Sequence, residues 1–210
     1  MPSAPTPGPR HERLIWLVCT ALVLAGLAGR IHELELPATF SFDERHFVKN
    51  ARRYLLGIRD GNDHPPFGKL LLSFSIGLFG DRPGAWRLPA LLAGVANIGL
   101  AAGLARVFFR DRLAAVLAAA FVAADGFLLV YSRTALLDGP LTTLILGATL
   151  LAACARRPAH VGIAALLAGA AMSVKFSGIV ALVPVFAAAV GPGMPRSTVI
   201  FVLFAPLTYG

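Results

Sequence analysis

Long apolar runs separated by short polar connections make up most of the chain. Seven of them approach the roughly 20 residues that an α-helix needs to cross a bilayer, although several fall short of that length. This pattern predicts a bundle of about seven transmembrane helices. The runs extend over about Leu14–Gly29, Trp86–Phe109, Leu113–Tyr131, Ala135–Ala155, Val161–Val174, Phe176–Val190 and from Ser197 to the C-terminus.

The first run allows two interpretations. It follows two arginines and ends in small residues, which is typical of a secretory signal. The apolar runs that follow it favour an uncleaved first span instead. Residues 1–13, which precede this run, are rich in proline and small polar residues, so we expect a disordered cytoplasmic tail there.

One long polar interval, residues 31–85, interrupts the apolar pattern. It holds seven of the eleven acidic residues and three of the five histidines. Within it, Phe67–Phe79 is apolar but too short to span a bilayer. We expect this segment to form a helix that lies at the membrane interface or re-enters the outer leaflet. Pro65 and Pro66 suit its start, because proline is tolerated in a first helical turn.

Composition favours a location in a bilayer. Hydrophobic residues make up 57% of the 210 residues and charged residues only 14%. The apolar share of a soluble domain, glycine included, is roughly 45–50%. The sequence therefore predicts an all-α polytopic membrane protein. Its two cysteines lie in apolar runs and indicate neither a disulfide framework nor a CxxC metal site.

The net charge of +8 indicates orientation. Arginines and lysines flank the apolar runs and do not form a stripe with interleaved aromatic residues, so we expect no nucleic-acid partner. Under the positive-inside rule, the basic connections at residues 106–112 and 156–157 are cytoplasmic. The N-terminus is then also cytoplasmic, and the interval 31–85 faces outward.

Asp43 and Glu44 are adjacent carboxylates inside this interval. On a regular helix the side chains of consecutive residues diverge by about 100°, so the two cannot aim at one atom. One of them could act as a general base while the other holds a partner. The alternative is that both are solvated acids of a loop. Two acids and a histidine are a poor metal-site signature, so we expect no metal.

His64, in the sequence His-Pro-Pro, lies five residues before Lys69. Proline restricts the residue before it to extended conformations, so the imidazole of His64 is held in few orientations. The pair indicates a stiffened turn with an imidazole and an ammonium group close together. A rigid helix start with an incidental histidine is the alternative.

Further charges lie at the outward ends of the apolar runs, namely Arg87, Arg133, Asp138 and Lys175. Arginine near a helix end is most often a snorkelling anchor, and Arg133 and Asp138 could simply pair. Three cations in one leaflet would also suit the phosphate of a lipid whose tail lies in the bilayer.

Five stretches occur in an order and at a spacing typical of one family. They are FDERHFVKNARRYL at 42–55, HPPFGKLLL at 64–72, WRLPALLAG at 86–94, SRTALLDGPL at 132–141 and SVKFSG at 173–178. Together they resemble the dolichyl-phosphate-mannose protein O-mannosyltransferase family. That resemblance implies a GT-C membrane fold with a long extracytoplasmic first loop.

The resemblance also implies a reaction. Members of the family transfer mannose, with inversion, from a dolichyl or polyprenyl phosphate to a serine or threonine hydroxyl. By motif, Asp43 would be the general base and Glu44 would organise the acceptor and the outer loop. Arg87, and less directly Arg133 and Lys175, would hold the donor phosphate, and His64 would shape the site. No cofactor is implied, since the lipid-linked sugar is a substrate.

The chain departs from the family in length, because it ends at Gly210, partway through its seventh span. It is therefore expected to be the N-terminal portion of the family fold or a short homologue. Two other functions stay open: transfer of another lipid-linked sugar to a lipid or glycan, and a truncated, non-catalytic membrane subunit or degenerate fragment. The chain could then form an oligomer or depend on a second subunit. A transporter is disfavoured, since the ionisable residues do not follow the midplane.

The expected partners are a polyprenyl-phosphate-linked mannose, a secreted or membrane protein acceptor, and membrane lipids. High usage of alanine, glycine and arginine is typical of a bacterium with a GC-rich genome. The expected location is therefore the plasma membrane, with the site on the outer face.

Overall fold

The computed structural model describes residues 9–59 and 64–204, with side chains from residue 13 onward. Within these ranges the chain forms helices and no strand. The helices are α1 (Pro9–Ile31), α2 (Glu44–Leu55), α3 (Phe67–Phe79), α4 (Pro83–Phe109), α5 (Arg112–Ala124), α6 (Gly126–Tyr131), α7 (Asp138–Ala153), α8 (Pro158–Val174), the 3-10 helix η1 (Phe176–Ala181), α9 (Leu182–Ala189) and α10 (Arg196–Phe204).

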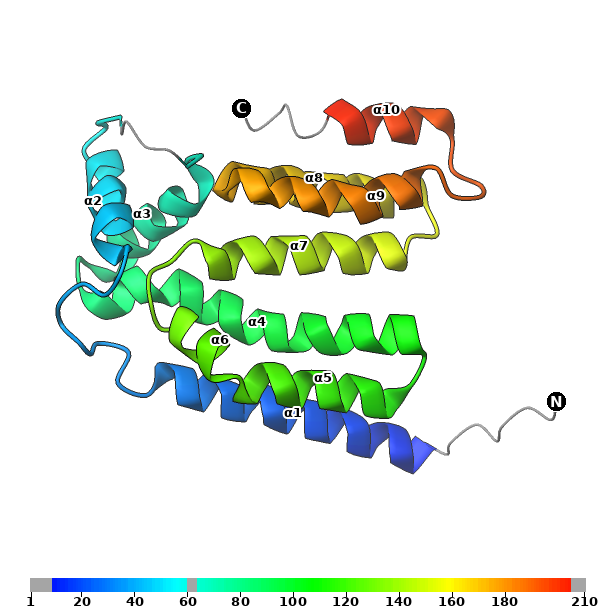
Figure 1. Cartoon of the computed structure of the whole chain (residues 1–210), viewed down its shortest axis with the longest axis horizontal. Coiled ribbons are helices and arrows are strands. Elements are labelled where there is room, and N and C mark those ends of the chain that lie inside the picture. Colours follow the sequence, from blue (N-terminus) through cyan, green and yellow to red (C-terminus); the bar gives the residue numbers. More distant parts are fainter. Residues whose placement is uncertain (1–8, 60–63, 205–210) are drawn as a thin grey trace.

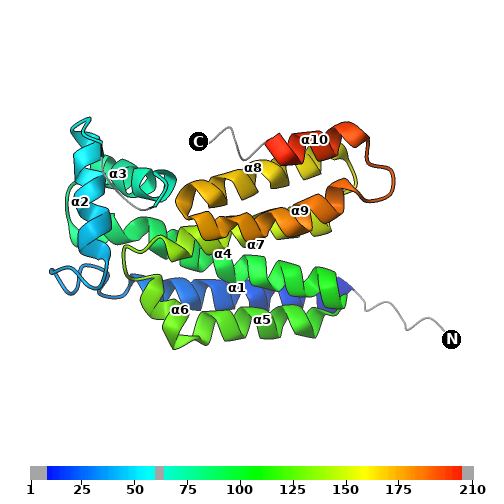
Figure 2. The same cartoon turned by 45° about the horizontal axis from the view of Figure 1, so that its top comes forward.

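The long helices run side by side, and α2 and α3 gather at one end of the bundle, which we call the loop end (Figure 1). α4 lies in the middle of the bundle and packs against α1, α3, α5 and α7. α7 in turn packs against α8 and α9, and α10 covers α8 and α9. The view in Figure 2 shows the same arrangement, with α2 and α3 again at the loop end.

The N-terminal helix begins earlier than the sequence predicted. α1 starts at Pro9, so the prediction of a disordered tail is wrong for residues 9–13, while residues 1–8 lie outside the described part of the chain. The run Leu113–Tyr131 is not one helix. It breaks at Asp125, whose carboxylate accepts a hydrogen bond from the Leu128 amide at 2.7 Å and so caps α6.

Two helical segments, Arg13–Ile31 and Pro83–Phe109, have the length and composition needed to cross a bilayer. The other apolar helices within the described ranges are shorter. Hydrophobic side chains along α1, α3, α5 and α9 are exposed, among them Trp16, Phe74, Phe121 and Val183. An apolar outer surface of this kind is typical of a protein in contact with lipid.

The short apolar helix of the polar interval is present. α3 has the bounds Phe67–Phe79 that the sequence predicted, although its position relative to a membrane stays a prediction. It begins after Pro66 and ends at Gly80, whose φ of 84° favours glycine. α2 was not predicted. Its buried residues, Glu44, Phe47, Val48 and Ala51, recur at the three- and four-residue spacing of one helix face.

Two cores hold the bundle together. The core at the loop end, which we call the loop-end core, joins Phe47, Val48, Ala51, Leu72, Ile76, Trp86, Ala135, Leu136, Leu137, Leu141, Ala171 and Val174. The second, which we call the alanine seam, joins α7, α8, η1, α9 and α10. It consists of Ala148, Ala152, Val161, Ala164, Ala165, Ala168, Ala181, Val185, Ala189 and Val202. Small side chains let helices approach closely, as they do in membrane bundles.

Candidate functional site

A buried ion pair between Glu44 and Arg87 lies at the loop end. Nε of Arg87 donates to Oε1 of Glu44 at 2.8 Å, and Nη2 donates to Oε2 at 3.0 Å. The two side chains are 0% and 1% exposed. This is the two-pronged geometry in which arginine binds a carboxylate most strongly.

Further hydrogen bonds make this pair the junction of three parts of the chain. The Glu44 carboxylate also accepts from the backbone amides of Ser41 and Ala135, both at 2.8 Å. Arg87 donates in addition to three backbone carbonyls of the connection between α1 and α2, those of Leu34 at 2.9 Å, Pro37 at 3.0 Å and Thr39 at 3.3 Å. The pair therefore ties that connection to α4 and to the segment before α7.

Asp43, the other carboxylate of the pair of acids, has the opposite environment. It is exposed and precedes α2, and its side chain makes no capping hydrogen bond to that helix. Its backbone carbonyl accepts from the His46 amide at 2.9 Å, which fixes the start of α2. Adjacent acids thus have different surroundings: the carboxylate of Glu44 is buried and paired, and the side chain of Asp43 is exposed to solvent.

A second cluster fastens the same connection from outside. The Phe40 ring stacks on the Trp86 ring with centroids 4.8 Å apart, and the Arg52 guanidinium lies 5.6 Å and 5.3 Å from the two ring centroids. Asp81 accepts from Nε1 of Trp86 at 2.7 Å and pairs with Nε of Arg52 at 2.8 Å. Arginine over aromatic faces adds a cation–π attraction to the ion pair.

The His-Pro-Pro turn and Lys69 are close together, as the sequence indicated. Nζ of Lys69 donates to the backbone carbonyl of His64 at 2.8 Å, and the lysine side chain is 1% exposed. The same Nζ lies 5.7 Å from the centroid of the Tyr54 ring, and the His64 ring lies 6.0 Å from that of Phe47. Lys69 therefore fixes the turn before α3 against α2.

The cations expected to hold a phosphate have other partners. Arg133 donates to the backbone carbonyls of His32 and Glu33 and does not pair with Asp138. Asp138 pairs with Lys175 at 2.8 Å, and these two side chains are 39% and 27% exposed. The suggested pairing of Arg133 with Asp138 is therefore wrong, because the end of α8 brings Lys175 to the start of α7.

Arg87, which was expected to hold the donor phosphate, is enclosed by partners within the protein. Its Nε, Nη1 and Nη2 all donate within the protein, and the side chain is buried. In this arrangement the guanidinium faces Glu44 and the connection after α1, and contact with a donor phosphate stays a prediction.

Sequence reasoning missed a further buried cation, Arg30, in the last turn of α1. Its guanidinium donates to the carbonyls of Gly26 at 3.1 Å and Val122 at 3.2 Å, and its side chain is 0% exposed. The carbonyls at the end of a helix lack intrahelical partners, so Arg30 caps α5 where that helix breaks at Asp125. An arginine at the very end of an apolar run was the available signal.

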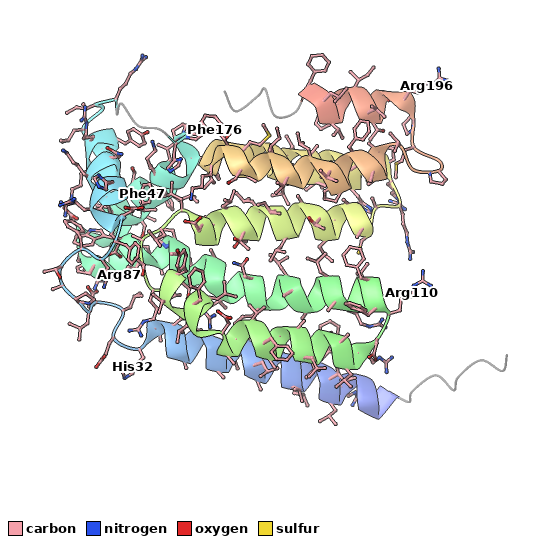
Figure 3. The ribbon with its side chains drawn as sticks, in the orientation of Figure 1. His32, Phe47, Arg87, Arg110, Phe176 and Arg196 are labelled. Carbon is pink, nitrogen blue, oxygen red and sulfur yellow. The ribbon has the colours of Figure 1, made fainter. Side chains whose placement is uncertain are left out.

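A further group of arginines lies at the end of the bundle opposite to the loop end. Figure 3 shows Arg110 and Arg196 at the end opposite to His32, Phe47 and Arg87. The connections between α4 and α5 and between α7 and α8 lie at that opposite end. Four more arginines lie in these connections or in the helix turns next to them: Arg106, Arg112, Arg156 and Arg157.

No metal site was found in the part of the chain that the structure describes, where no three His, Cys, Asp or Glu side chains lie close enough to hold an ion. A cavity of about 280 Å³ lies between α4, α6 and α7. Its polar lining residues include Asn97, Ser132, Asp138 and Thr142.

Comparisons with known proteins agree with this architecture. A sequence family described as dolichyl-phosphate-mannose-protein mannosyltransferase matches residues 63–208. The polyprenol-phosphate-mannose–protein mannosyltransferase of Mycobacterium tuberculosis is 31% identical over 151 residues, which are 67% of this chain and 29% of that protein. The protein of the same name from Mycolicibacterium smegmatis is 32% identical over 149 residues, 65% of this chain and 29% of its own length.

A solved structure shares the fold. It is the Saccharomyces cerevisiae protein O-mannosyltransferase Pmt1-Pmt2 complex bound to the sugar donor, with a TM-score of 0.75 and 21% identity. The match covers 93% of this chain and 31% of that one. The chain thus spans about three tenths of the length of the relatives that it matches. Because the family match covers more than half of the residues, the chain belongs to the dolichyl-phosphate-mannose-protein mannosyltransferase family.

Proposed function

We propose that the chain carries the catalytic base of a protein O-mannosyltransferase, which moves mannose from a polyprenyl phosphate to a serine or threonine hydroxyl. The observation that carries the proposal is the contrast between Asp43 and Glu44. Asp43 is exposed, and its neighbour is buried in a bidentate pair with Arg87. Family membership supplies the reaction, and the contrast supplies the residue.

In the proposed reaction, the Asp43 carboxylate accepts the proton of the acceptor hydroxyl while the hydroxyl oxygen attacks C1 of mannose. The bond between C1 and the phosphate oxygen breaks, and the polyprenyl phosphate leaves with the bonding electrons. One displacement inverts the configuration at C1 and needs one base. The leaving phosphate needs cationic stabilisation, which the protein must supply.

Arg87 has a different role in this proposal from the one that the family resemblance implied. Because its guanidinium is buried against Glu44, we assign it to positioning: it holds the connection that presents Asp43. Lys175 remains our first choice for the donor phosphate, since its ammonium group is partly exposed beside Asp138. Arg133 is the second choice, and His64 and Lys69 shape the turn next to α2.

The proposed topology places the loop end outside the plasma membrane of a bacterium and the opposite end in the cytoplasm. The arginines of the short connections at the opposite end support this orientation, and the Arg and Lys residues of the longer interval 31–85 are an exception to the positive-inside rule. About seven segments cross the bilayer in this proposal, with α5 and α6 counted as one and η1 and α9 as another. The bacterial relatives support the location in a bacterial membrane.

The test is transfer by the chain reconstituted in lipid nanodiscs. The substrates are polyprenyl-phosphate mannose and a Ser/Thr peptide, and mass spectrometry detects the mannosyl peptide. Product in which the configuration at C1 is opposite to that of the donor supports the proposal. Transfer of another sugar, or transfer only to a lipid or glycan acceptor, would identify a different enzyme of this fold.

A subunit role is the second candidate, and one observation favours it. The chain matches only 29% of the length of its bacterial relatives, and the yeast structure is a complex of two proteins. Turnover that appears only when a second chain is added would support this candidate. Turnover by the chain alone would rule it out.

A further inference from the structure

Phe42, the residue directly before Asp43, protrudes from the connection between α1 and α2. Its side chain is 89% exposed, the largest fraction among the exposed large hydrophobic residues in the described part of the chain. Its φ is +52°, in the left-handed region. A bulky aromatic residue in this region is an outlier that persists only where the surrounding structure holds it, and such outliers cluster at functional sites.

The residues around Phe42 are held firmly, so its exposure does not reflect a loose loop. On one side, Phe40 stacks on Trp86, and the Ser41 amide donates to the Glu44 carboxylate at 2.8 Å. On the other side, Glu44 is buried against Arg87. The chain is thus fastened two residues before and two residues after Phe42, and the ring between these anchors points away from the protein.

We infer that the Phe42 ring is a contact surface for the acceptor polypeptide, next to the hydroxyl that Asp43 deprotonates. The inference rests on the proposed function, and it adds the group that binds the acceptor. A lipid-linked donor is held through its phosphate and its tail. The reacting serine or threonine side chain of an acceptor is uncharged, so apolar contacts and hydrogen bonds next to it would hold it. An aromatic ring on a rigid backbone gives a large contact area at a small loss of entropy.

The charges near Phe42 disfavour the bilayer as the occupant. Asp43 follows it directly, and Arg45 and His46 are exposed on the first turn of α2. Burying the Phe42 ring in hydrocarbon would bring the charged Asp43 and Arg45 and the polar His46 to the same depth, at a large desolvation cost. A polypeptide can contact the ring and leave the charges in water.

The experiment measures binding of a fluorescent Ser/Thr peptide to the whole chain in nanodiscs, by anisotropy and without donor. Phe42→Ala should weaken peptide binding by about tenfold, as loss of an aromatic anchor does. Phe42→Trp should retain binding, since it keeps a ring. Phe42→Gly relieves the left-handed φ but lacks the ring, so it should bind as weakly as Phe42→Ala.

Phe74→Ala is the matched control, because Phe74 is another exposed ring, 68% accessible, on a different element, α3. It should leave peptide binding unchanged. Wild-type affinity in Phe42→Ala or in Phe42→Gly would overturn the inference, as would the absence of peptide binding by the unaltered chain. A higher KM for the donor with an unchanged KM for the peptide would also overturn it and assign the ring to the donor.

These outcomes are separate from those of the proposed function. Peptide binding that depends on Phe42, without any transfer, would support the contact surface and count against the mannosyltransferase activity. Mannose transfer by Phe42→Ala with an unchanged KM for the acceptor would support the mannosyltransferase activity and count against the contact surface.

Discussion

The loop end and the alanine seam are held together in different ways. At the loop end, Glu44 and Arg87 place two opposite charges where neither is exposed, and hydrogen bonds from three parts of the chain surround them. The alanine seam contains no charged side chain and packs small residues of α7 to α10 against one another. The loop end therefore depends on a few individual groups, and the seam depends on the close fit of many.

This difference follows from what each region must do. In the proposed function, the general base Asp43 must be held at a defined position while it stays exposed, and the hydrogen bonds of Glu44 and Arg87 behind it would give that position. The seam only needs to bring helices together, for which small side chains suffice. The effects of substitutions on stability should consequently differ between the two regions in size and in cause.

The largest effect is expected from Glu44→Ala, which leaves the Arg87 guanidinium buried without its carboxylate. Removing one partner of a buried ion pair costs about 3–5 kcal/mol of stability. The apparent melting temperature in detergent should fall sharply, as followed by tryptophan fluorescence. Arg45→Ala, which removes the exposed charge next to Glu44, is the control and should change little. Equal melting temperatures for the two variants would mean that the pair does not hold the loop end.

The next effect in size is expected from Gly178→Ala in η1, a helix that contributes Ala181 to the alanine seam and lies against Ala171 of the loop-end core. A Cβ atom there would lie 2.3 Å from the backbone carbonyl carbon of Ala171 in α8, so backbone would have to move. Overpacking of this kind costs about 1–3 kcal/mol. Gly147→Ala in α7 is the matched control, since its Cβ would meet only the Leu167 side chain at 3.5 Å. If both variants have the melting temperature of the wild type, η1 does not approach α8 as closely as the structure shows.

The smallest effect is expected from Glu35→Gln, which removes an exposed ion pair with Arg82 at the loop end. Pairs open to solvent contribute about 0–1 kcal/mol. The glutamine can still accept the hydrogen bond that the Gly84 amide donates to Glu35 at 3.0 Å. The melting temperature should change by a small amount that decreases further at high salt. A fall in melting temperature as large as that of Glu44→Ala would show that burial does not explain a difference in stability between the two ion pairs.

Much of the helical framework could be predicted from the sequence. Apolar runs and proline positions predicted α3 with its observed bounds, and also the approximate extents of α4, α7 and α8. These features are local, since they depend on the length of a run and on where proline interrupts it. The break at Asp125 was not predicted, because apolar residues continue on both sides of it.

The partners of the charged residues could not be predicted in the same way. Lys175 pairs with Asp138, and Arg133 bonds to carbonyls after α1, because tertiary packing sets which helix ends meet. The burial of Glu44 depends on Arg87, which lies 43 residues away along the chain. Sequence reasoning could say that two adjacent acids must diverge, but only the structure shows that Glu44 is the buried one.

The central claim is that the two acids divide the work, with Glu44 holding the connection and Asp43 accepting the proton. The most direct test is Asp43→Asn in the membrane-reconstituted protein, with mannose transfer and the melting temperature measured on the same sample. We predict a loss of transfer of at least about 100-fold, the lower range for a general base, together with an unchanged melting temperature. Normal transfer by Asp43→Asn, or unfolding as severe as that of Glu44→Ala, would contradict this division.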